Sequence, residues 1–187
     1  MGNRDWYDPD LVKSRFLVLS ACVLALDQWT KLWIETSFEP HGRLTVLPGF
    51  FDLVYVRNTG IAFGLFPAGG ELAGTLLLTA LGFAALVVVS IYFRATSERE
   101  PLLLLSLSLV LGGAVGNLVD RLLMRAVTDF LDVYVGSYHW PAFNVADSGV
   151  TVGIILMLAH SFGPQLRRRP NAAETSRHGL VQARTSK

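Results

Sequence analysis

Cysteine is almost absent from this chain of 187 residues: Cys22 is the only one, so no disulfide can form within the chain. Charged residues are absent from Leu72 to Phe93, a run long enough to cross a bilayer core, which takes about 20 apolar residues. The sequence has no HExxH spacing and no internal repeat. These absences exclude a disulfide-stapled scaffold and a repeat array, and we expect no bound metal and no cofactor.

Three further apolar stretches accompany the uncharged run, and together the four predict a mainly α-helical membrane protein. The overall apolar content of 51% decides little, whereas the continuity of the runs is typical of transmembrane helices. The last stretch is short, because its apolar core covers only Ser148–Phe162 and Phe143–Asp147 would lie at the interface. The expected spans are 16–34, 72–93, 102–123 and 146–163.

Basic residues cluster in three segments that would share one side of the membrane: 4–15, 94–99 and 167–187. An excess of Lys and Arg marks the cytoplasmic side, so both termini are predicted to be cytoplasmic. Residues 1–163 would form one membrane domain, and 164–187 a basic cytoplasmic tail without ordered structure. The net charge of +1 gives no reason to expect a nucleic-acid partner.

The two outer segments, 35–71 and 124–146, differ in composition. Leu44–Phe66 is rich in β-branched and aromatic residues with Gly and Pro between them, which predicts short strands in a small sheet on the membrane surface. The second segment contains Gly136 and Pro141 as breakers, and we predict a loop with a short helical piece. Asp52 and Asp132 are interpreted as loop residues.

Polar residues of the spans converge on one depth near the outer interface. At 1.5 Å per residue, Asp27 lies about 16 Å beyond Phe16, and Asn117 lies about 22 Å beyond Leu102. Lys31 follows Asp27 by four residues, so the two share a helix face and can pair. Ionisable groups within spans are candidates for a functional site. The same depth receives Asn58, Asp120, Arg121, Asp129, Asn144 and Asp147.

Each of these residues also has a structural interpretation that stays open at this point. Asp27 with Lys31 is consistent with a structural ion pair, and Asp120 with Arg121 with anchoring at the interface. Asn117 and Asn144 could hydrogen-bond between helices without a catalytic part. The small-xxx-small spacing of residues 112–116 favours close helix packing.

Asp129 and Asp147 have no basic partner in the immediate sequence and would lie at a membrane boundary. Two carboxylates brought together there cannot both ionise readily, so the pair would hold one proton. The ionised member could then take a proton from water while the protonated member polarises a carbonyl. The helix start at Asp147 would favour the ionised form of that residue. This pattern predicts aspartic-protease chemistry.

Other interpretations remain. A transporter would also use intramembrane Asp, Lys and Asn, although no ionisable group falls in the inner half of the second or third span. A metal-dependent protease could draw on carboxylates and a histidine, and Ser148, or Ser137 near His139, gives a weak indication of serine hydrolysis. Lipidation of Cys22 is less favoured than packing, because the apolar run continues straight through it. The metal set would be Asp129, Asp132, His139 and Asp147.

Five motifs in order along the chain resemble those of the bacterial lipoprotein signal peptidases, the signal peptidase II family. No motif position departs from the family pattern, and the resemblance covers nearly the whole chain up to Gly153. The matching stretches are "DQWTK" (27–31), "NTGIAFG" (58–64), "GGAVGNLVDR" (112–121), "VTDF" (127–130) and "FNVADS" (143–148).

The resemblance implies an aspartic endopeptidase that cuts prolipoproteins before a lipobox cysteine already carrying diacylglyceryl. Its catalytic pair would be Asp129 and Asp147. It implies a monomer in the bacterial inner membrane with an extracytoplasmic β-cradle and the active site facing outward. Membrane lipid would surround the site, and globomycin would block it. Substrate-binding positions would be Asn58, Asn117, Arg121 and Asn144, with structural support from Asp27, Lys31 and Asp120.

Overall fold

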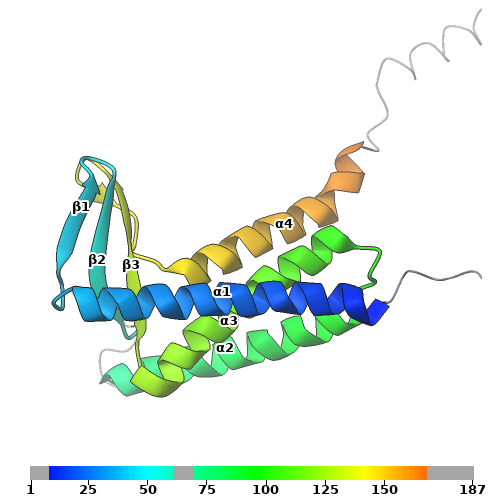
Figure 1. Cartoon of the computed structure of the whole chain (residues 1–187), viewed down its shortest axis with the longest axis horizontal. Helices are drawn as coiled ribbons and strands as arrows, with labels where there is room; N and C mark the ends of the chain where they lie inside the picture. Colours follow the sequence, from blue (N-terminus) through cyan, green and yellow to red (C-terminus); the bar gives the residue numbers. More distant parts are fainter. Residues whose placement is uncertain (1–8, 61–69, 168–187) are drawn as a thin grey trace, which may run out of the picture.

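The computed structural model describes residues 9–60 and 70–167, which form four long helices and a small sheet (Figure 1). All four helices are long and apolar enough to cross a membrane, which confirms the four predicted spans. Each helix extends past the predicted apolar run by one or more residues at one end or both, because helical backbone continues into the polar ends. The helices are α1 (Pro9–Ser37), α2 (Gly70–Ala95), α3 (Pro101–Met124) and α4 (Val145–Arg167).

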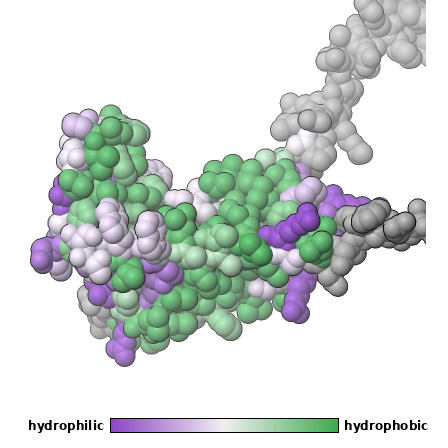
Figure 2. Space-filling model, viewed as in Figure 1, coloured by the Kyte–Doolittle hydropathy of each residue, from purple (hydrophilic) through white to green (hydrophobic). Residues whose placement is uncertain are grey.

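The surface of the helices is apolar where lipid would contact it. Figure 2 shows hydrophobic residues over the visible middle of the helical part, with hydrophilic residues gathered toward its two ends. Large apolar side chains such as Val88, Ile91 and Ile155 are exposed on α2 and α4. A protein in water would bury such a surface, so these faces fit a hydrocarbon solvent.

Helix α3 is the centre of the bundle, because it packs against each of the other three helices. Glycine permits this approach at two adjacent positions. A Cβ on Gly112 would lie 2.6 Å from the carbonyl oxygen of Ser20 in α1, and one on Gly113 would overlap the carbonyl oxygen of Ala146 in α4. The predicted packing role of the glycine-rich stretch is therefore confirmed.

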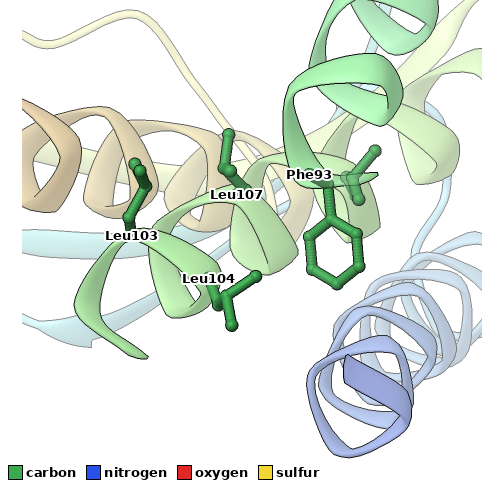
Figure 3. Packing of buried hydrophobic residues seen from close by; sticks show 5 residues of the cluster. Phe93, Leu103, Leu104 and Leu107 are labelled. Atoms are coloured by element: carbon green, nitrogen blue, oxygen red, sulfur yellow. The ribbon is translucent and has the colours of Figure 1, made fainter. Parts of the chain in front are cut away.

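The end of the bundle farthest from the sheet has an apolar core between α2 and α3. Phe93 of α2 lies among Leu103, Leu104 and Leu107 of α3, and all four side chains are buried (Figure 3). Among the described residues, no charged group belongs to this cluster. The core therefore holds the helices together at the end opposite the sheet.

The sheet is antiparallel, with strand order β1-β2-β3-β4, and lies at the end of the helices where α1 stops and α4 starts (Figure 1). The strands predicted in the first outer segment are confirmed up to Asn58, and the rest of that prediction, 61–66, lies outside the described residues. The strands are β1 (Arg43–Leu47), β2 (Phe51–Asn58), β3 (Val127–Val135) and β4 (Tyr138–His139).

The second outer segment is where the sequence prediction was wrong. The segment expected to be a loop with a short helical piece contains strand β3, and β4 follows the turn at Gly136. Strand β3 is a run of β-branched and aromatic residues broken by Asp129 and Asp132, and it finds its hydrogen-bonding partner in β2. Its register places Val56 opposite Asp129, so this strand, rather than a loop, positions that carboxylate.

Asp52 and Asp132 are also not loop residues. They lie opposite each other on β2 and β3, and both side chains are buried. The guanidinium of Arg43 pairs with both carboxylates, and Nδ1 of His139 lies 2.9 Å from Oδ1 of Asp132. The cluster explains how two acidic residues can face each other within a sheet.

The junction between sheet and helices is a second apolar core. Ile34 near the end of α1, Tyr55 of β2 and Phe130 of β3 are buried against one another.

At the other end of the molecule, α4 continues to Arg167, so 164–167 are helical rather than part of an unstructured tail. The remainder of the predicted tail, 168–187, lies outside the described residues.

Candidate active site

The start of α4 brings Asn144 and Asp147 together in a capping box. The side-chain oxygen of Asn144 accepts a hydrogen bond from the backbone N–H of Asp147 at 2.9 Å. In return, Oδ2 of Asp147 accepts from the backbone N–H of Asn144 at 3.3 Å. Both bonds satisfy backbone donors that a helix start leaves unpaired. The carboxylate of Asp147 is therefore fixed at the end of the helix.

Two asparagine amides hold Asp129 on strand β3. Nδ2 of Asn58 donates to Oδ2 of Asp129 at 2.8 Å, and Nδ2 of Asn144 donates to Oδ1 at 2.8 Å. Each amide orientation is determined, because Oδ1 of Asn58 accepts from the backbone N–H of Gly60 and Oδ1 of Asn144 accepts from that of Asp147. Both asparagines must therefore present a donor to Asp129.

Burial is the dominant influence on the charge of Asp129. Loss of water raises the pKa of Asp129 from its ordinary value of 3.8 to about 6. The hydrogen bond from Asn58 opposes the rise, the nearby charge of Asp147 adds to it, and the hydrogen bond from Asn144 opposes it again. The two carboxylates are thus near enough to influence each other, and Asn144 contacts both.

A third asparagine, Asn117 of α3, holds Asp147. Nδ2 of Asn117 donates to Oδ1 of Asp147 at 2.7 Å. The oxygen of Asn117 faces Nζ of Lys31 at 3.1 Å, and an ammonium can only donate. Nδ2 of Asn144 donates to the same oxygen at 3.2 Å, so Lys31 and Asn144 together determine which end of the Asn117 amide meets Asp147.

Lys31 is buried and lies between two carboxylates of different helices. Its Nζ is 2.7 Å from Oδ2 of Asp27 in α1 and 2.7 Å from Oδ2 of Asp120 in α3. The other oxygen of Asp27 accepts from the backbone N–H of Ala146 at 2.8 Å, so Asp27 also caps α4. The network connects α1, α3 and α4 directly beneath the carboxylate pair. Such pairing is what a buried charge requires.

Arg121 lies one turn after Asn117 on α3, and its guanidinium is half-buried. Nη1 of Arg121 donates to the backbone oxygen of Asn117 at 3.3 Å. Within residues 9–60 and 70–167 it makes no hydrogen bond to Asp129 or Asp147. The structure thus brings all nine site residues predicted from the sequence to one end of the bundle, with Arg121 beside the carboxylates rather than bonded to them.

Sequence reasoning missed Gln28, which belongs to the same network. Its Nε2 donates to Oδ1 of Asp120 at 2.8 Å and lies 3.2 Å from Oδ2 of Asp27. The available signal was a polar amide inside a span, one residue after Asp27 and on the helical turn that leads to Lys31. The amide satisfies Oδ1 of Asp120, the oxygen of that carboxylate that Lys31 does not contact.

Two cavities adjoin the carboxylate pair, and residues of segment 140–143 line both of them. The cavity beside Asp147 has a volume of about 460 Å³ and lies on the outward face of α4. The cavity beside Asp129 has a volume of about 260 Å³ and lies against the end of β2. Ser148 also lines the larger cavity, and sequence reasoning did not assign the other lining residues to the site: Trp140, Phe143, Thr151 and Val152 for the larger, and Val56, Arg57, Thr59, Pro141 and Ala142 for the smaller.

The geometry gives no support to two of the alternative sites. In the part of the chain that the structure describes, no group of three His, Cys, Asp or Glu side chains could hold a metal ion. His139 faces Asp132, and the hydroxyl of Ser148 donates to the backbone oxygen of Asn144 at 2.9 Å. The described contacts therefore pair neither His139 nor Ser148 as a hydrolase would require.

Comparisons with known proteins agree on one family. The family model described as signal peptidase (SPase) II matches residues 19–163. The chain is 47% identical over 146 residues to a lipoprotein signal peptidase of Oleidesulfovibrio alaskensis, covering 76% of this chain and 92% of that protein. It is 41% identical over 143 residues to one of Syntrophus aciditrophicus, covering 76% and 89%.

Solved structures resemble the fold as well. A bacterial membrane enzyme solved by the in meso method at 2.3 Å resolution matches with a TM-score of 0.67 and 28% identity, covering 84% of this chain and 93% of that one. A second, at 1.9 Å resolution, matches with a TM-score of 0.66 and 30% identity, covering 78% and 90%.

Proposed function

The chain belongs to the signal peptidase II family, and we propose that Asp129 and Asp147 together activate the water with which it cleaves its substrates. It is a multi-pass membrane protease that removes signal peptides from prolipoproteins. The observation that supports the proposal best is Asn144, which donates to both carboxylates, from its side chain to Asp129 of β3 and from its backbone N–H to Asp147 of α4. A pair held in this way can share one proton.

In the proposed reaction Asp147 is the ionised member. It takes a proton from water as the water oxygen attacks the scissile carbonyl carbon, and Asp129 gives its proton to the carbonyl oxygen. The tetrahedral intermediate then collapses: the C–N bond breaks, the proton held by Asp147 passes to the departing amine, and one hydroxyl of the intermediate returns its proton to Asp129 as the C=O bond re-forms. Burial favours the neutral form of Asp129, which supports this division of roles.

The remaining residues of the site have two kinds of role in this proposal. Asn58, Asn117, Arg121 and Asn144 lie on the substrate side and orient the carboxylates or bind the peptide. Asp27, Lys31 and Asp120 support them from beneath by fixing the Asn117 amide and the start of α4. Support of this kind holds reactive groups in a productive geometry.

The cleaved bond lies, in our proposal, before a cysteine that carries diacylglyceryl. The cavity beside Asp147 suits that lipid, because it lies on the lipid-facing side of α4 and is lined by Trp140, Phe143 and Val152. The smaller cavity beside Asp129 would take the polar part of the cleavage segment. Globomycin would compete for the same space.

The same proposal includes the orientation of the protein in the membrane. Both termini would be in the cytoplasm of a bacterial cell and the site would lie at the outer face of the inner membrane, because Lys and Arg predominate at the opposite end of the bundle. The enzyme would act as a monomer, since the carboxylate pair is complete within one chain.

The deciding experiment incubates the purified protein with one prolipoprotein in two forms, with and without diacylglyceryl on the lipobox cysteine. Cleavage immediately before the cysteine of the diacylated form only, stopped by globomycin, would support the proposal. Equal cleavage of both forms would contradict the assigned substrate, and cleavage elsewhere would contradict the assigned bond.

The pH dependence should report the proton on Asp129. The proposed role requires that proton, and its occupancy falls as pH rises through the pKa of about 6. We expect kcat/KM to decrease about tenfold per pH unit on the alkaline side of this value. Asn58→Ala removes a donor that favours the carboxylate, so the alkaline limb should move to higher pH. An unmoved limb in this variant would show that another group titrates.

A further inference from the structure

A third cavity lies on the same end of the bundle, between the start of α2 and the end of α3. Its volume is about 290 Å³, and neither carboxylate of the pair lines it, although Arg57 and Thr59 also line the cavity beside Asp129. The lining includes two arginines, Arg57 and Arg125, and two threonines, Thr59 and Thr75. Among the described residues that line it, none is acidic. The cavity therefore has a strongly positive wall.

We propose that this cavity binds the phosphate of an anionic membrane phospholipid. Guanidinium groups bind phosphate oxygens through charge-assisted hydrogen bonds, often in pairs. Basic pockets between transmembrane helices are typical sites for anionic lipid head groups. The proposal depends on these residues and not on the reaction proposed above.

The guanidinium of Arg57 is held at the cavity by the end of α3. Its Nη2 donates to the backbone oxygen of Met124 at 3.1 Å, where a helix end leaves carbonyl groups unpaired. A guanidinium has several N–H donors, and this bond occupies one of its nitrogens. The contact fixes the direction of the group and leaves other donors for an anion.

Arg125 occupies a backbone conformation that glycine would adopt more easily. It follows the last residue of α3 with φ of 59°, in the left-handed region where helices commonly end on glycine. A non-glycine residue in a strained backbone conformation suggests that its side chain has a function. Here the side chain lines the same cavity as Arg57.

Thr75 joins the elements that form the cavity wall. Its hydroxyl lies 3.1 Å from the backbone oxygen of Arg125 and 3.3 Å from that of Thr59, so one side chain of α2 contacts the ends of both α3 and β2. The side chain of Thr75 is buried. The two arginines are thus carried by backbone segments that are fixed to each other.

The position of the cavity near the membrane boundary and its apolar surroundings favour a lipid over a free anion. It lies where α2 begins and α3 ends, at the boundary between the spans and the sheet. Leu72 contributes an apolar wall, and the exposed side chains of Leu122 and Leu123 lie on the last turn of α3. Acyl chains could therefore pack against leucines below a phosphate held by arginines.

The test titrates the purified protein in detergent micelles with phosphatidylglycerol, phosphatidylcholine or inorganic phosphate, and counts bound molecules by native mass spectrometry. We expect tighter binding of phosphatidylglycerol than of phosphatidylcholine. Arg125→Gly and Arg57→Gln should each weaken phosphatidylglycerol binding by about tenfold or more, since each removes a charged hydrogen bond. Arg125→Gly should also keep the unfolding temperature at or above that of the wild type, because glycine relieves the backbone strain.

Arg99→Gln is the matched control, because it removes one positive charge from the loop at the opposite end of α2 and α3. Wild-type lipid binding in this variant, with loss in the other two, would support the site. Equal phosphatidylglycerol affinity in Arg125→Gly and the wild type would overturn it. Saturation by inorganic phosphate with no gain from the lipid would assign the cavity to a free anion and overturn the lipid.

Discussion

Asp129→Asn and Asp147→Asn should each lower the rate of prolipoprotein cleavage by about a thousandfold or more. Asparagine has nearly the same shape as aspartate but can neither take a proton from water nor give one to a carbonyl oxygen. The amide oxygen that Asp147→Asn introduces would still accept from the backbone N–H of Asn144, so the capping box and the start of α4 should persist. The new NH2 group of either variant would face an asparagine donor, which should lower the unfolding temperature somewhat without unfolding the protein, so the loss should appear chiefly in the rate.

The measurement is cleavage of a diacylated prolipoprotein by purified variants, together with the unfolding temperature of each. Glu39→Gln serves as the control, because it makes the same chemical change on an exposed residue of the outer segment. Normal processing by either Asp→Asn variant would remove that aspartate from the mechanism. Loss of activity together with loss of folding would be a structural effect and would not support the pair.

Lys31→Met should destabilise the protein by about 3–5 kcal/mol, because it leaves two buried carboxylates without their cation. Nζ of Lys31 is 2.7 Å from both Asp27 and Asp120, and all three side chains are buried. The variant also removes one of the two donors that orient the Asn117 oxygen. Cleavage should therefore fall even in molecules that remain folded.

A triple variant separates these two effects. Adding Asp27→Asn and Asp120→Asn to Lys31→Met removes all three charges together, and such a neutral replacement is often close to the wild type in stability. We expect the unfolding temperature to recover and the cleavage rate to remain low, because the Asn117 oxygen still lacks the ammonium and keeps only the donor from Asn144. An unfolding temperature of Lys31→Met equal to that of the wild type would show that the buried carboxylates do not need the lysine.

The helices could be predicted from the sequence because apolar continuity is a local property. Strand β3 could not, because its partner β2 lies about 70 residues earlier and a strand without its partner looks like a loop. The misreading of Asp52 and Asp132 has the same origin. Opposed carboxylates become acceptable only when Arg43 reaches both of them, and no local pattern contains that contact.

The sequence predicts at which level of the membrane the site residues lie, but not how their side chains are oriented toward one another. Rise along the helices places Asp27 and Asn117 near one level, which the structure confirms through Lys31. The orientation of each asparagine amide depends on a backbone N–H or an ammonium from elsewhere in the chain. Sequence spacing cannot give such directions, and the cavities beside the carboxylates also depend on side chains of several elements.

The spacing of Asp27 and Lys31 has a consequence for biogenesis. Helix α1 is synthesised long before α3, so its two ionised residues must be inserted before Asp120 and Asn117 exist. Four residues apart on one turn, they neutralise each other within the nascent segment and lower the cost of leaving water. When α3 follows, Lys31 gains its second carboxylate, and the ion pair that eased entry becomes the joint between the two helices.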